Sequence, residues 1–338
     1  MKRLFVGLLL VLSCGKGGSN GNAMTWNAAN GNLGSAITVD QLVSSPDGAL
    51  YAIVGHSLFK STDGAVSWQT TGPAAFPGVQ AIAVQPGQPA VLYALTAQPS
   101  GSLTSYPLIR SLDHGATWSQ AADLETTLGA NGTPSGLLKL GTGSPPAIYV
   151  GVNGIRGDTA LLYSGDGGAS FTQTSKVADL VVSQANPMVA YSVSPSGAFN
   201  GAVSKSTDNG AHFTQVFVDP SGVSALDIGA TPDDLYIAGE TGSISHAFTG
   251  TPSSVATSRM SLPRAFSLVA GALDPSVVLL IALNVQVYLS TDSAVSFSAQ
   301  NAGLPALPSV LVADLARKGV FYALVPGSGL FTASIIAH

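Results

Sequence analysis

One short motif returns five times along the chain. Its pattern is Ser-x-Asp-x-Gly-x-(Ser/Thr)-aromatic. The leading serines are Ser61, Ser111, Ser164, Ser206 and Ser290, at intervals of 50, 53, 42 and 84 residues. Because the last interval is twice the one before it, we expect a degenerate copy over residues 242–247, with Ala247 in the serine slot. A further step of the same size leads to Ala333. These spacings predict seven units of roughly forty residues.

Each unit carries other strand-like runs besides the motif. An apolar run with a tyrosine recurs at Tyr51, Tyr93, Tyr149, Tyr191, Tyr236 and Tyr322, and in the sixth unit residues 279–281 (Leu-Leu-Ile) replace it. Another apolar run lies upstream, for example at residues 81–84 or 225–228. Short apolar runs between Gly, Pro and Asp turn signals are typical of strands. Four strands in about forty residues predict an all-β fold, a seven-bladed β-propeller of four-stranded antiparallel blades.

The two ends of the chain predict how this ring closes. The last unit ends after three expected strands, at residues 309–315, 320–325 and 329–334. Before the first complete unit, residues 25–27 resemble a stray fourth strand, with Trp26 in the aromatic slot of the motif. We therefore expect the N-terminal strand to complete the last blade, which removes an open sheet edge.

Charged side chains are scarce in this chain. They make up 9% of the residues, and the net charge is -5, whereas about 25% is usual. Thirteen Lys and Arg residues are too few for the basic surface that neutralises phosphates, so we expect no nucleic-acid partner. Two Glu residues also argue against long helices, which use Glu freely.

The N-terminus has the features of a secretion signal. Two basic residues precede an apolar stretch at residues 4–12, which is too short to span a bilayer. The single cysteine, Cys14, follows at once in Val-Leu-Ser-Cys, which resembles a bacterial lipobox. The resemblance implies a lipoprotein signal peptide at 1–13, acylation of Cys14, a flexible tether at 14–23 and one propeller domain at 24–338. The expected location is the bacterial cell envelope, held to the membrane by the lipid anchor alone.

The repeated motif resembles the Asp-box, or BNR repeat, of the sialidase and sortilin-like superfamily. That superfamily includes sialidases, other glycoside hydrolases, sortilin-like receptors and photosystem assembly factors. The resemblance implies that each box is the turn between the third and fourth strands of a blade, with its aspartate bonding turn N–H groups. We interpret these aspartates as structural: Asp63, Asp113, Asp166, Asp208 and Asp292. Ala65 and Ala294 replace the box glycine, so those two turns are expected to be strained or shifted.

Catalytic residues are hard to find in this sequence. A sialidase would need an Arg-Ile-Pro motif, three arginines and a Tyr–Glu pair, and the pattern is absent. Another glycoside hydrolase would need two carboxylates roughly 5–9.5 Å apart. Aligning the inner strands brings forward Asp227 and Asp314 as weak candidates in the central channel. The alternative is that each bonds backbone N–H groups of neighbouring blades. The five histidines have no ligand spacing, so we expect neither metal nor cofactor.

Long loops point to a binding face. The longest are residues 98–107, 121–136, 153–160 and 194–201, and in a propeller they share one face. The side chains that we expect to contact a ligand there are Tyr106, Asp123, Glu125, Asn131, Arg156, Asp158 and Phe199. The preferred hypothesis is a monomeric, non-catalytic binding or assembly module for an envelope protein or glycan. The alternatives are a glycoside hydrolase that uses channel carboxylates and a purely structural envelope protein.

Overall fold

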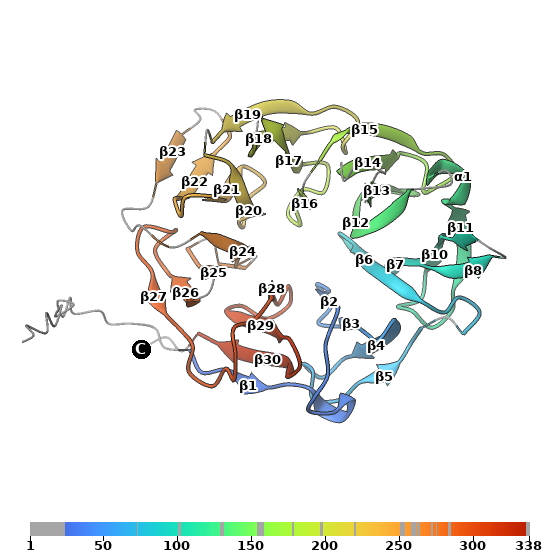
Figure 1. The fold of residues 1–338 in the computed structure, drawn as a ribbon, viewed down its shortest axis with the longest axis horizontal. Helices are drawn as coiled ribbons and strands as arrows, with labels where there is room; N and C mark the ends of the chain where they lie inside the picture. Colours follow the sequence, from blue (N-terminus) through green and yellow to red (C-terminus); the bar gives the residue numbers. More distant parts are fainter. Residues whose placement is uncertain are drawn as a thin grey trace, which may run out of the picture.

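The chain folds into a closed ring of seven four-stranded sheets around a central channel (Figure 1). The computed structural model describes residues 24–335, except positions 73, 101–102, 129–131, 154–158, 178, 197–198, 220, 251–253, 258–261, 263, 272, 275 and 283–284. Over these residues the architecture is that of an all-β, seven-bladed β-propeller, as the repeat spacing predicts.

Each blade is an antiparallel sheet whose first strand lines the channel and whose fourth lies at the rim. Blade 1 contains β2 (Gln41–Ser44), β3 (Leu50–Val54), β4 (Ser57–Ser61) and β5 (Gln69–Thr70). Blade 2 contains β6 (Val79–Gln85), β7 (Gln88–Thr96), β10 (Pro107–Ser111) and β11 (Ser119–Asp123). Blade 3 contains β12 (Thr133–Gly143), β13 (Pro146–Asn153), β14 (Thr159–Ser164) and β15 (Thr172–Lys176). Blade 4 contains β16 (Asp179–Val182), β17 (Ala190–Ser196), β18 (Phe199–Ser206) and β19 (Thr214–Val218).

The remaining blades follow the same order. Blade 5 contains β20 (Val223–Ile228), β21 (Asp234–Gly239), β22 (Ile244–Phe248) and β23 (Ser254–Thr257). Blade 6 contains β24 (Ala265–Ala270), β25 (Val278–Ala282), β26 (Gln286–Ser290) and β27 (Ser298–Ala299). Blade 7 contains β28 (Val310–Ala313), β29 (Val320–Val325), β30 (Gly329–Ser334) and β1 (Asn27–Ala28). A hairpin of β8 (Gln98–Ser100) and β9 (Leu103–Ser105), a turn of 3-10 helix at Gly31–Leu33 and α1 (Glu125–Leu128) complete the described elements.

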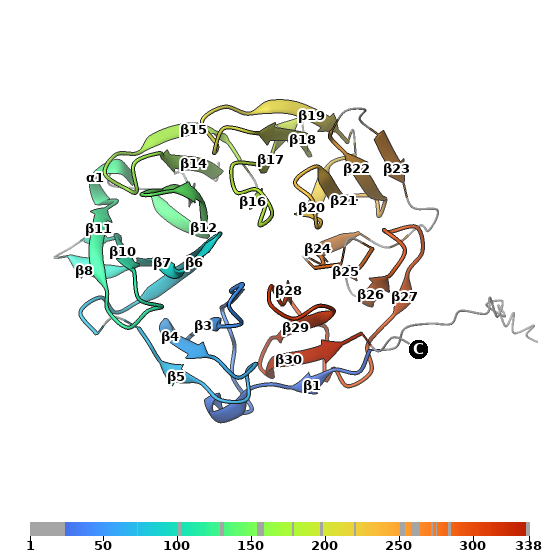
Figure 2. The same ribbon diagram turned by 180° about the vertical axis from the view of Figure 1, so that it is seen from behind.

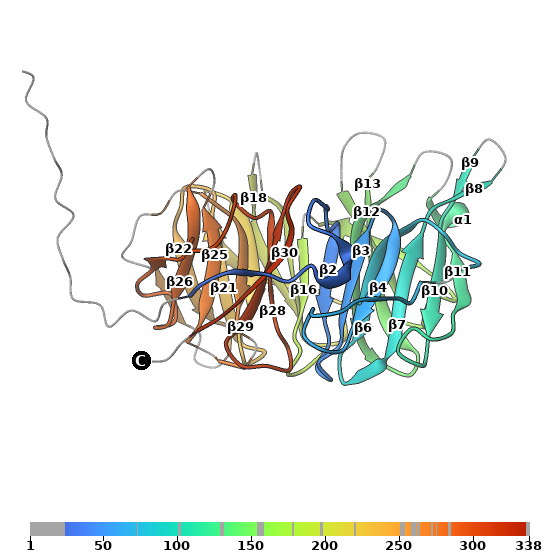
Figure 3. The same ribbon diagram turned by 90° about the horizontal axis from the view of Figure 1, so that it is seen from below.

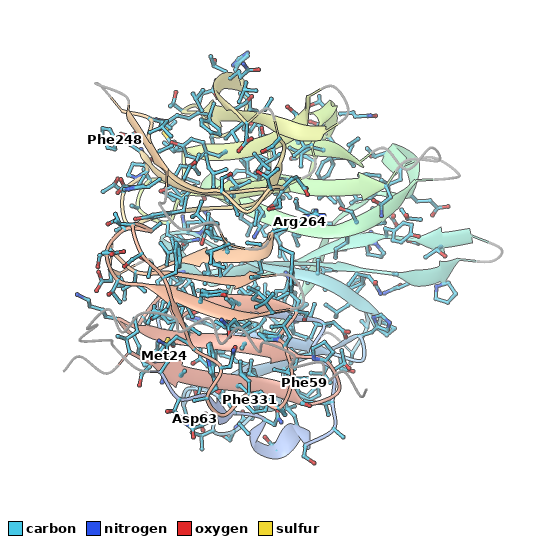
Figure 4. All side chains as sticks on the ribbon, turned by 60° about the vertical axis from the view of Figure 1, so that its left-hand side comes forward. Met24, Phe59, Asp63, Phe248, Arg264 and Phe331 are labelled. Atoms are coloured by element: carbon cyan, nitrogen blue, oxygen red, sulfur yellow. The ribbon has the colours of Figure 1, made fainter. Side chains whose placement is uncertain are left out.

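The N-terminal strand closes the ring, as predicted. It pairs antiparallel with β30, where Asn27 faces Thr332 and Ala28 faces Phe331 (Figure 2). Trp26 is buried beside this strand, and its indole N–H donates to the backbone oxygen of Gln300 at 2.9 Å. Met24 and Phe331, from opposite ends of the described chain, belong to the same apolar cluster (Figure 4). The closing pair starts two residues later than the sequence pattern indicated.

Seven Leu or Ile side chains, one from each blade, form the inner layer of the core. We call this set the leucine ring. Each inner strand places one Leu or Ile at the same register, and all seven are buried. These residues are Leu42, Ile82, Leu138, Leu180, Leu226, Leu268 and Leu311. Burying apolar side chains between neighbouring blades is the main stabilising contribution that a propeller has available.

The recurring tyrosines of blades 1, 3 and 4 contact the blade that follows them. Tyr51 of blade 1 donates from its hydroxyl to the backbone oxygen of His114, in the box turn of blade 2. The Tyr191 hydroxyl of blade 4 likewise bonds Thr249 at 2.5 Å, in the turn between β22 and β23 of blade 5, and it also donates to the backbone oxygen of Pro232 in the turn between β20 and β21. Gly210, in the box turn of blade 4, leaves room for the Tyr149 ring from blade 3. At these junctions the tyrosine therefore faces the polar turn between the third and fourth strands of the following blade.

Blade 6 breaks this pattern for a reason that the ring closure explains. The strand register puts Leu279 in the tyrosine slot, opposite Val269 and Leu289. The next blade has no such turn, because its third and fourth strands, β30 and β1, come from opposite ends of the chain. Leu279 is fully buried and packs in the apolar cluster that contains Met24 and Trp26. Without a polar turn to meet, an apolar side chain fills the slot.

Candidate functional site

The five box turns share one hydrogen-bond arrangement. In each box the serine hydroxyl donates to Oδ1 of the aspartate at 2.7–2.8 Å. The same aspartate accepts the backbone N–H four residues later at 2.8–3.0 Å and the side chain of that residue through Oδ2. In the fourth box that side chain is His212, whose Nδ1 lies 2.7 Å from Asp208 Oδ2. Both oxygens of every box aspartate are therefore engaged in their own turn.

These bonds stabilise the charged form of the aspartates. The side-chain and backbone bonds from Ser67 lower the pKa of Asp63 to about 2, and Thr117 and Ser170 lower the pKa of their aspartates similarly. A carboxylate that accepts several donors resists protonation. Such a group suits a turn and not general acid catalysis near neutral pH.

The two alanines that replace a box glycine leave the turns in place. Ala65 has a φ of 74° and Ala294 a φ of 65°, the left-handed region that glycine adopts at lower cost. The backbone N–H of Ala65 still donates to Ser61 Oγ at 2.9 Å, and that of Ala294 to Ser290 Oγ at 2.9 Å. Of the two expected effects, strain or a shift of the turn, the structure shows a strained backbone in a turn that keeps its place.

Blade 5, which lacks a box, uses other side chains at the same place. Ala247 pairs with Leu235, as the box serines pair with the corresponding residue of their own blades. Lys205 of blade 4 reaches Asp233 and Thr249 of blade 5, and Tyr191 bonds Thr249 at 2.5 Å. Sequence reasoning missed this cluster, because its four members come from two strands of blade 4 and two turns of blade 5 without a common spacing.

A cavity of about 720 Å³ occupies the centre of the ring and is lined by all seven inner strands. It extends from Asp40 and Val310, near the start of the inner strands, to turn residues at their other ends. At the level opposite the tyrosine slot, the wall consists of Val43, Ala83, Lys139, Val181, Asp227, Val269 and Val312. Five of these seven positions are apolar, and the two charged ones are Lys139 and Asp227.

Asp227 lines this cavity and also connects two blades. Its Oδ2 accepts the backbone N–H of Ala270 in blade 6 at 2.9 Å, and its Oδ1 accepts that of Ile228 at 2.9 Å. Although part of its surface faces the channel, the surrounding protein desolvates the carboxylate and raises its pKa to about 6. The structure therefore places Asp227 in the channel, as one hypothesis predicted. It also shows the bond to a backbone N–H of the neighbouring blade that the alternative hypothesis predicted.

Asp314 lies in a different environment from Asp227. It follows the end of β28, is 3% exposed, and does not belong to the described lining of the cavity. Its Oδ1 accepts two N–H groups of its own turn, from Ala316 and Arg317, and its Oδ2 accepts Arg317 Nε at 2.8 Å and the Tyr322 hydroxyl at 3.1 Å. The two aspartates paired from the sequence are thus not brought together as a pair in the cavity.

The long connections gather on one face of the ring. The β8–β9 hairpin and α1 lie on that side, as do the extended ends of β12, β13 and β18 (Figure 3). Asp123 joins the first two of these elements, because its Oδ2 accepts Ser105 Oγ at 2.7 Å and its Oδ1 accepts the Glu125 N–H at 3.0 Å. The half-buried Tyr106 packs beside them, and its backbone oxygen accepts the N–H of Leu124.

Most of the other predicted residues lie outside the described part of the chain. Asn131, Arg156 and Asp158 lie outside the described residues, as does Cys14 with the 1–13 and 14–23 segments. Phe199 begins β18, so its backbone lies at the same face. The structure therefore brings Tyr106, Asp123 and Glu125 together at the junction of blades 2 and 3.

Sequence reasoning missed two charged residues of the channel, Lys139 and Asp179. Both line the cavity, from blades 3 and 4. Asp179 pairs with Val193 two positions before Val181, and its Oδ1 accepts the backbone N–H of Leu180. The signal was present, because aligning all seven inner strands on the leucine ring brings these charges into view together with Asp227.

Within the ranges given above, no helix has the length and apolar character needed to cross a membrane. In that same part of the chain, no three His, Cys, Asp or Glu side chains gather closely enough to hold a metal ion.

Several solved structures of known proteins resemble this fold. No protein-family model matches the sequence, and no curated protein matches it. Among solved structures, the GH74 enzyme of Niastella koreensis aligns with a TM-score of 0.68 and 18% identity over 91% of this chain and 54% of that one. A structure of YCF48 bound to D1 peptide aligns at 0.65 and 13% over 94% and 97%, and YCF48 from Cyanidioschyzon merolae at 0.64 and 11% over 91% and 98%.

These similarities establish the architecture. The chain spans about half the length of the GH74 enzyme and nearly the whole of both YCF48 structures. At 11–18% identity the likeness is one of fold, and the shared fold is the β-propeller.

Proposed function

We propose that this protein is a non-catalytic binding or assembly module of the cell envelope, and that it recognises a protein partner through its loop-rich face. The observation that carries the proposal is the junction of the β8–β9 hairpin with α1. There Asp123 holds both elements in place, and the partly exposed Tyr106 and Glu125 lie beside it. Aromatic side chains held on a rigid scaffold are typical of interface anchors.

A related fold of the same length supports a polypeptide as the partner. One of the similar structures is described as YCF48 bound to D1 peptide, and this chain covers 97% of it. A propeller of this size is thus able to hold a peptide.

The experiment is site-specific photo-crosslinking in cells. A photoreactive phenylalanine replaces Tyr106 or Glu125, and the matched control replaces Val66 or Leu112, which are exposed box residues at the opposite face. We expect a discrete protein adduct from positions 106 and 125 and none from 66 and 112. Equal adducts from both faces, or none from either, would contradict the proposal. Saturable binding to a glycan array without a protein adduct would make the partner a glycan.

A glycoside hydrolase is the second candidate, and one observation favours it. The carboxyl of Asp227 faces the channel with a pKa raised to about 6, and a raised pKa is what a general acid needs. Both of its oxygens already accept backbone N–H groups, and Asp314 is held in its turn by Arg317. Hydrolysis of a panel of fluorogenic glycosides that is lost in Asp227→Asn would establish the enzyme. Turnover that is absent, or unchanged in the variant, would reject it.

The proposal includes attachment to the envelope through Cys14. A lipid anchor would hold the propeller near a membrane surface, since several acyl chains on one residue bind firmly where one binds marginally. Replacing Cys14 with Ser should move the protein from the membrane to the soluble fraction and abolish labelling with a palmitate analogue. Retention of both properties in the variant would contradict the anchor.

A further inference from the structure

The inner strands give the central channel one charged wall and one largely apolar wall, and Asp40, just before β2, adds a carboxylate at one end. Lys139, Asp179 and Asp227 come from the inner strands of the neighbouring blades 3, 4 and 5. The corresponding positions of blades 6, 7, 1 and 2 are neutral and mostly apolar: Val269, Val312, Val43 and Ala83 at one level, and Ser267, Val310, Gln41 and Ala81 at the other. Small-molecule sites in proteins commonly combine an apolar wall with a few polar groups.

Three of the neutral polar side chains that line this channel, Gln41, Ser44 and Ser267, are already engaged by the fold. Gln41 accepts the N–H of Ile82 at 2.9 Å and donates to the oxygen of the same residue at 3.2 Å. Ser267 Oγ accepts the N–H of Leu311 at 3.4 Å. These groups connect blades. Of the other polar side chains, Gln184 lies in the turn after β16, and Asp40, just before β2, accepts the N–H of Gly55 through Oδ2 at 3.1 Å. Lys139, Asp179 and Asp227 are therefore the charged side chains that the inner strands themselves present to a ligand.

Lys139 is the cation of this wall. Its side chain is exposed within the channel, and in the described part of the chain no hydrogen bond or ion pair involves it. Asp227 lies within electrostatic range of both Lys139 and Asp179. Asp179 uses Oδ1 for the N–H of Leu180, which leaves Oδ2 for another donor. Asp227 thus lies between an ammonium and a second carboxylate, and no direct ion pair joins it to Lys139.

This arrangement of charges restricts what the channel can hold. A purely anionic molecule would pair with Lys139 but would also meet the fields of Asp179 and Asp227. A purely cationic one would pair with the carboxylates but would leave Lys139 beside a like charge. A molecule with both charges satisfies each group, and charges removed from water need such partners.

The size and the mouth of the cavity define the body of the ligand. Its 720 Å³ falls in the range of about 300–1,000 Å³ that takes molecules of a few hundred daltons. At the ends of the inner strands it is lined by Pro46, Ala185, Ala230, Leu273 and Leu315, which are apolar. These residues lie in the turns between first and second strands, at the face opposite the long loops.

We propose that the channel binds a short zwitterionic peptide of two or three apolar residues, with its carboxylate on Lys139, its ammonium on Asp179 and Asp227, and its side chains against the valine wall. The peptide enters through the apolar mouth. This site is separate from the loop-rich face, so it stands or fails independently of the partner proposed there.

Calorimetric titration of the full chain tests the proposal with three probes: Leu-Leu, N-acetyl-Leu-Leu and Leu-Leu-amide. We expect saturable binding of Leu-Leu and about tenfold weaker binding when either end is capped, because each cap removes one charged hydrogen-bonding group. The Lys139→Met variant should lose the preference for Leu-Leu over the amide. The Asp179→Asn variant should lose the preference over the acetylated peptide.

A lysine outside the channel provides the control. Lys318→Met removes an exposed lysine that is paired with Asp274 outside the channel lining, and it should retain both preferences. A second substitution, Lys139→Gln, keeps the test valid if the Met variant folds poorly by circular dichroism. No saturable heat with Leu-Leu at millimolar concentration, equal affinity for all three probes, or an unchanged preference in both Lys139 variants would overturn the proposal.

Discussion

Removing the side chain of Trp26 tests whether the N-terminal strand holds the ring closed. Trp26 is 2% exposed, and its indole N–H bonds the backbone oxygen of Gln300. Replacing a buried Trp by Ala costs about 3–5 kcal/mol, and the lost hydrogen bond adds about 1 kcal/mol. With an unfolding entropy of about 2.1 cal/mol/K per residue over roughly 310 residues, Trp26→Ala should lower the Tm by about 6–9 °C.

The assay combines thermal unfolding with hydrogen exchange, and Trp118→Ala is the matched control. Trp118 is a half-buried box tryptophan whose indole N–H bonds Thr71 and Gly115, at the junction of blades 1 and 2. Only the Trp26 variant should speed exchange in β30, because β1 pairs with that strand. A Tm loss below about 2 °C, or equal exchange of β30 in both variants, would refute the closure reasoning.

Three further outcomes follow from single contacts. Tyr191→Phe should cost about 1–2 kcal/mol of unfolding free energy in urea, because it removes bonds to Pro232 and Thr249, whereas Tyr149→Phe should cost almost nothing, since its buried hydroxyl has no partner among the described residues. Folding lowers the pKa of Asp113 to about 2. The stability that this carboxylate contributes is therefore present above pH 4 and is lost as the pH falls toward 2. The Asp113→Asn variant should show a smaller loss of unfolding free energy in urea titrations between pH 5 and 2.5. Folding raises the pKa of Asp227 to about 6, so its proton is held more firmly in the folded state, and the wild type should gain stability from pH 7 to 4.5 while Asp227→Asn gains less.

The strand boundaries of the blades could be predicted accurately from the sequence. The expected strands at 320–325 and 329–334 coincide with β29 and β30, and Ala333 pairs with Phe321 in the slot of a box serine. Turn chemistry made this possible, because each Ser-x-Asp turn uses only atoms within eight consecutive residues. A local arrangement of that kind leaves the same mark at every repeat.

The candidate site was less accessible from the sequence. Asp227 and Asp314 looked equivalent after alignment of the inner strands, but one reaches into the cavity while the other is enclosed by Arg317 and its own turn. The register explains the difference: Asp227 pairs with Tyr236, whereas Val312 pairs with Tyr322, so Asp314 lies two positions further along, past the end of β28. A shift of two residues moves the side chain from the strand into the following turn, and the spacing of apolar residues alone does not fix where a strand ends.

What the sequence determined by itself is the number of units, their turns and the strand that closes the ring. Only the tertiary structure decided what each unit meets in its neighbour. In the sequence, Leu279 interrupts a row of tyrosines, and no local pattern links Lys139 with Asp179. Ring closure removes the polar turn that a tyrosine at position 279 would meet, and it places the two charges on one wall of the channel with Asp227. Such contacts join residues forty or more positions apart, so no local pattern records them.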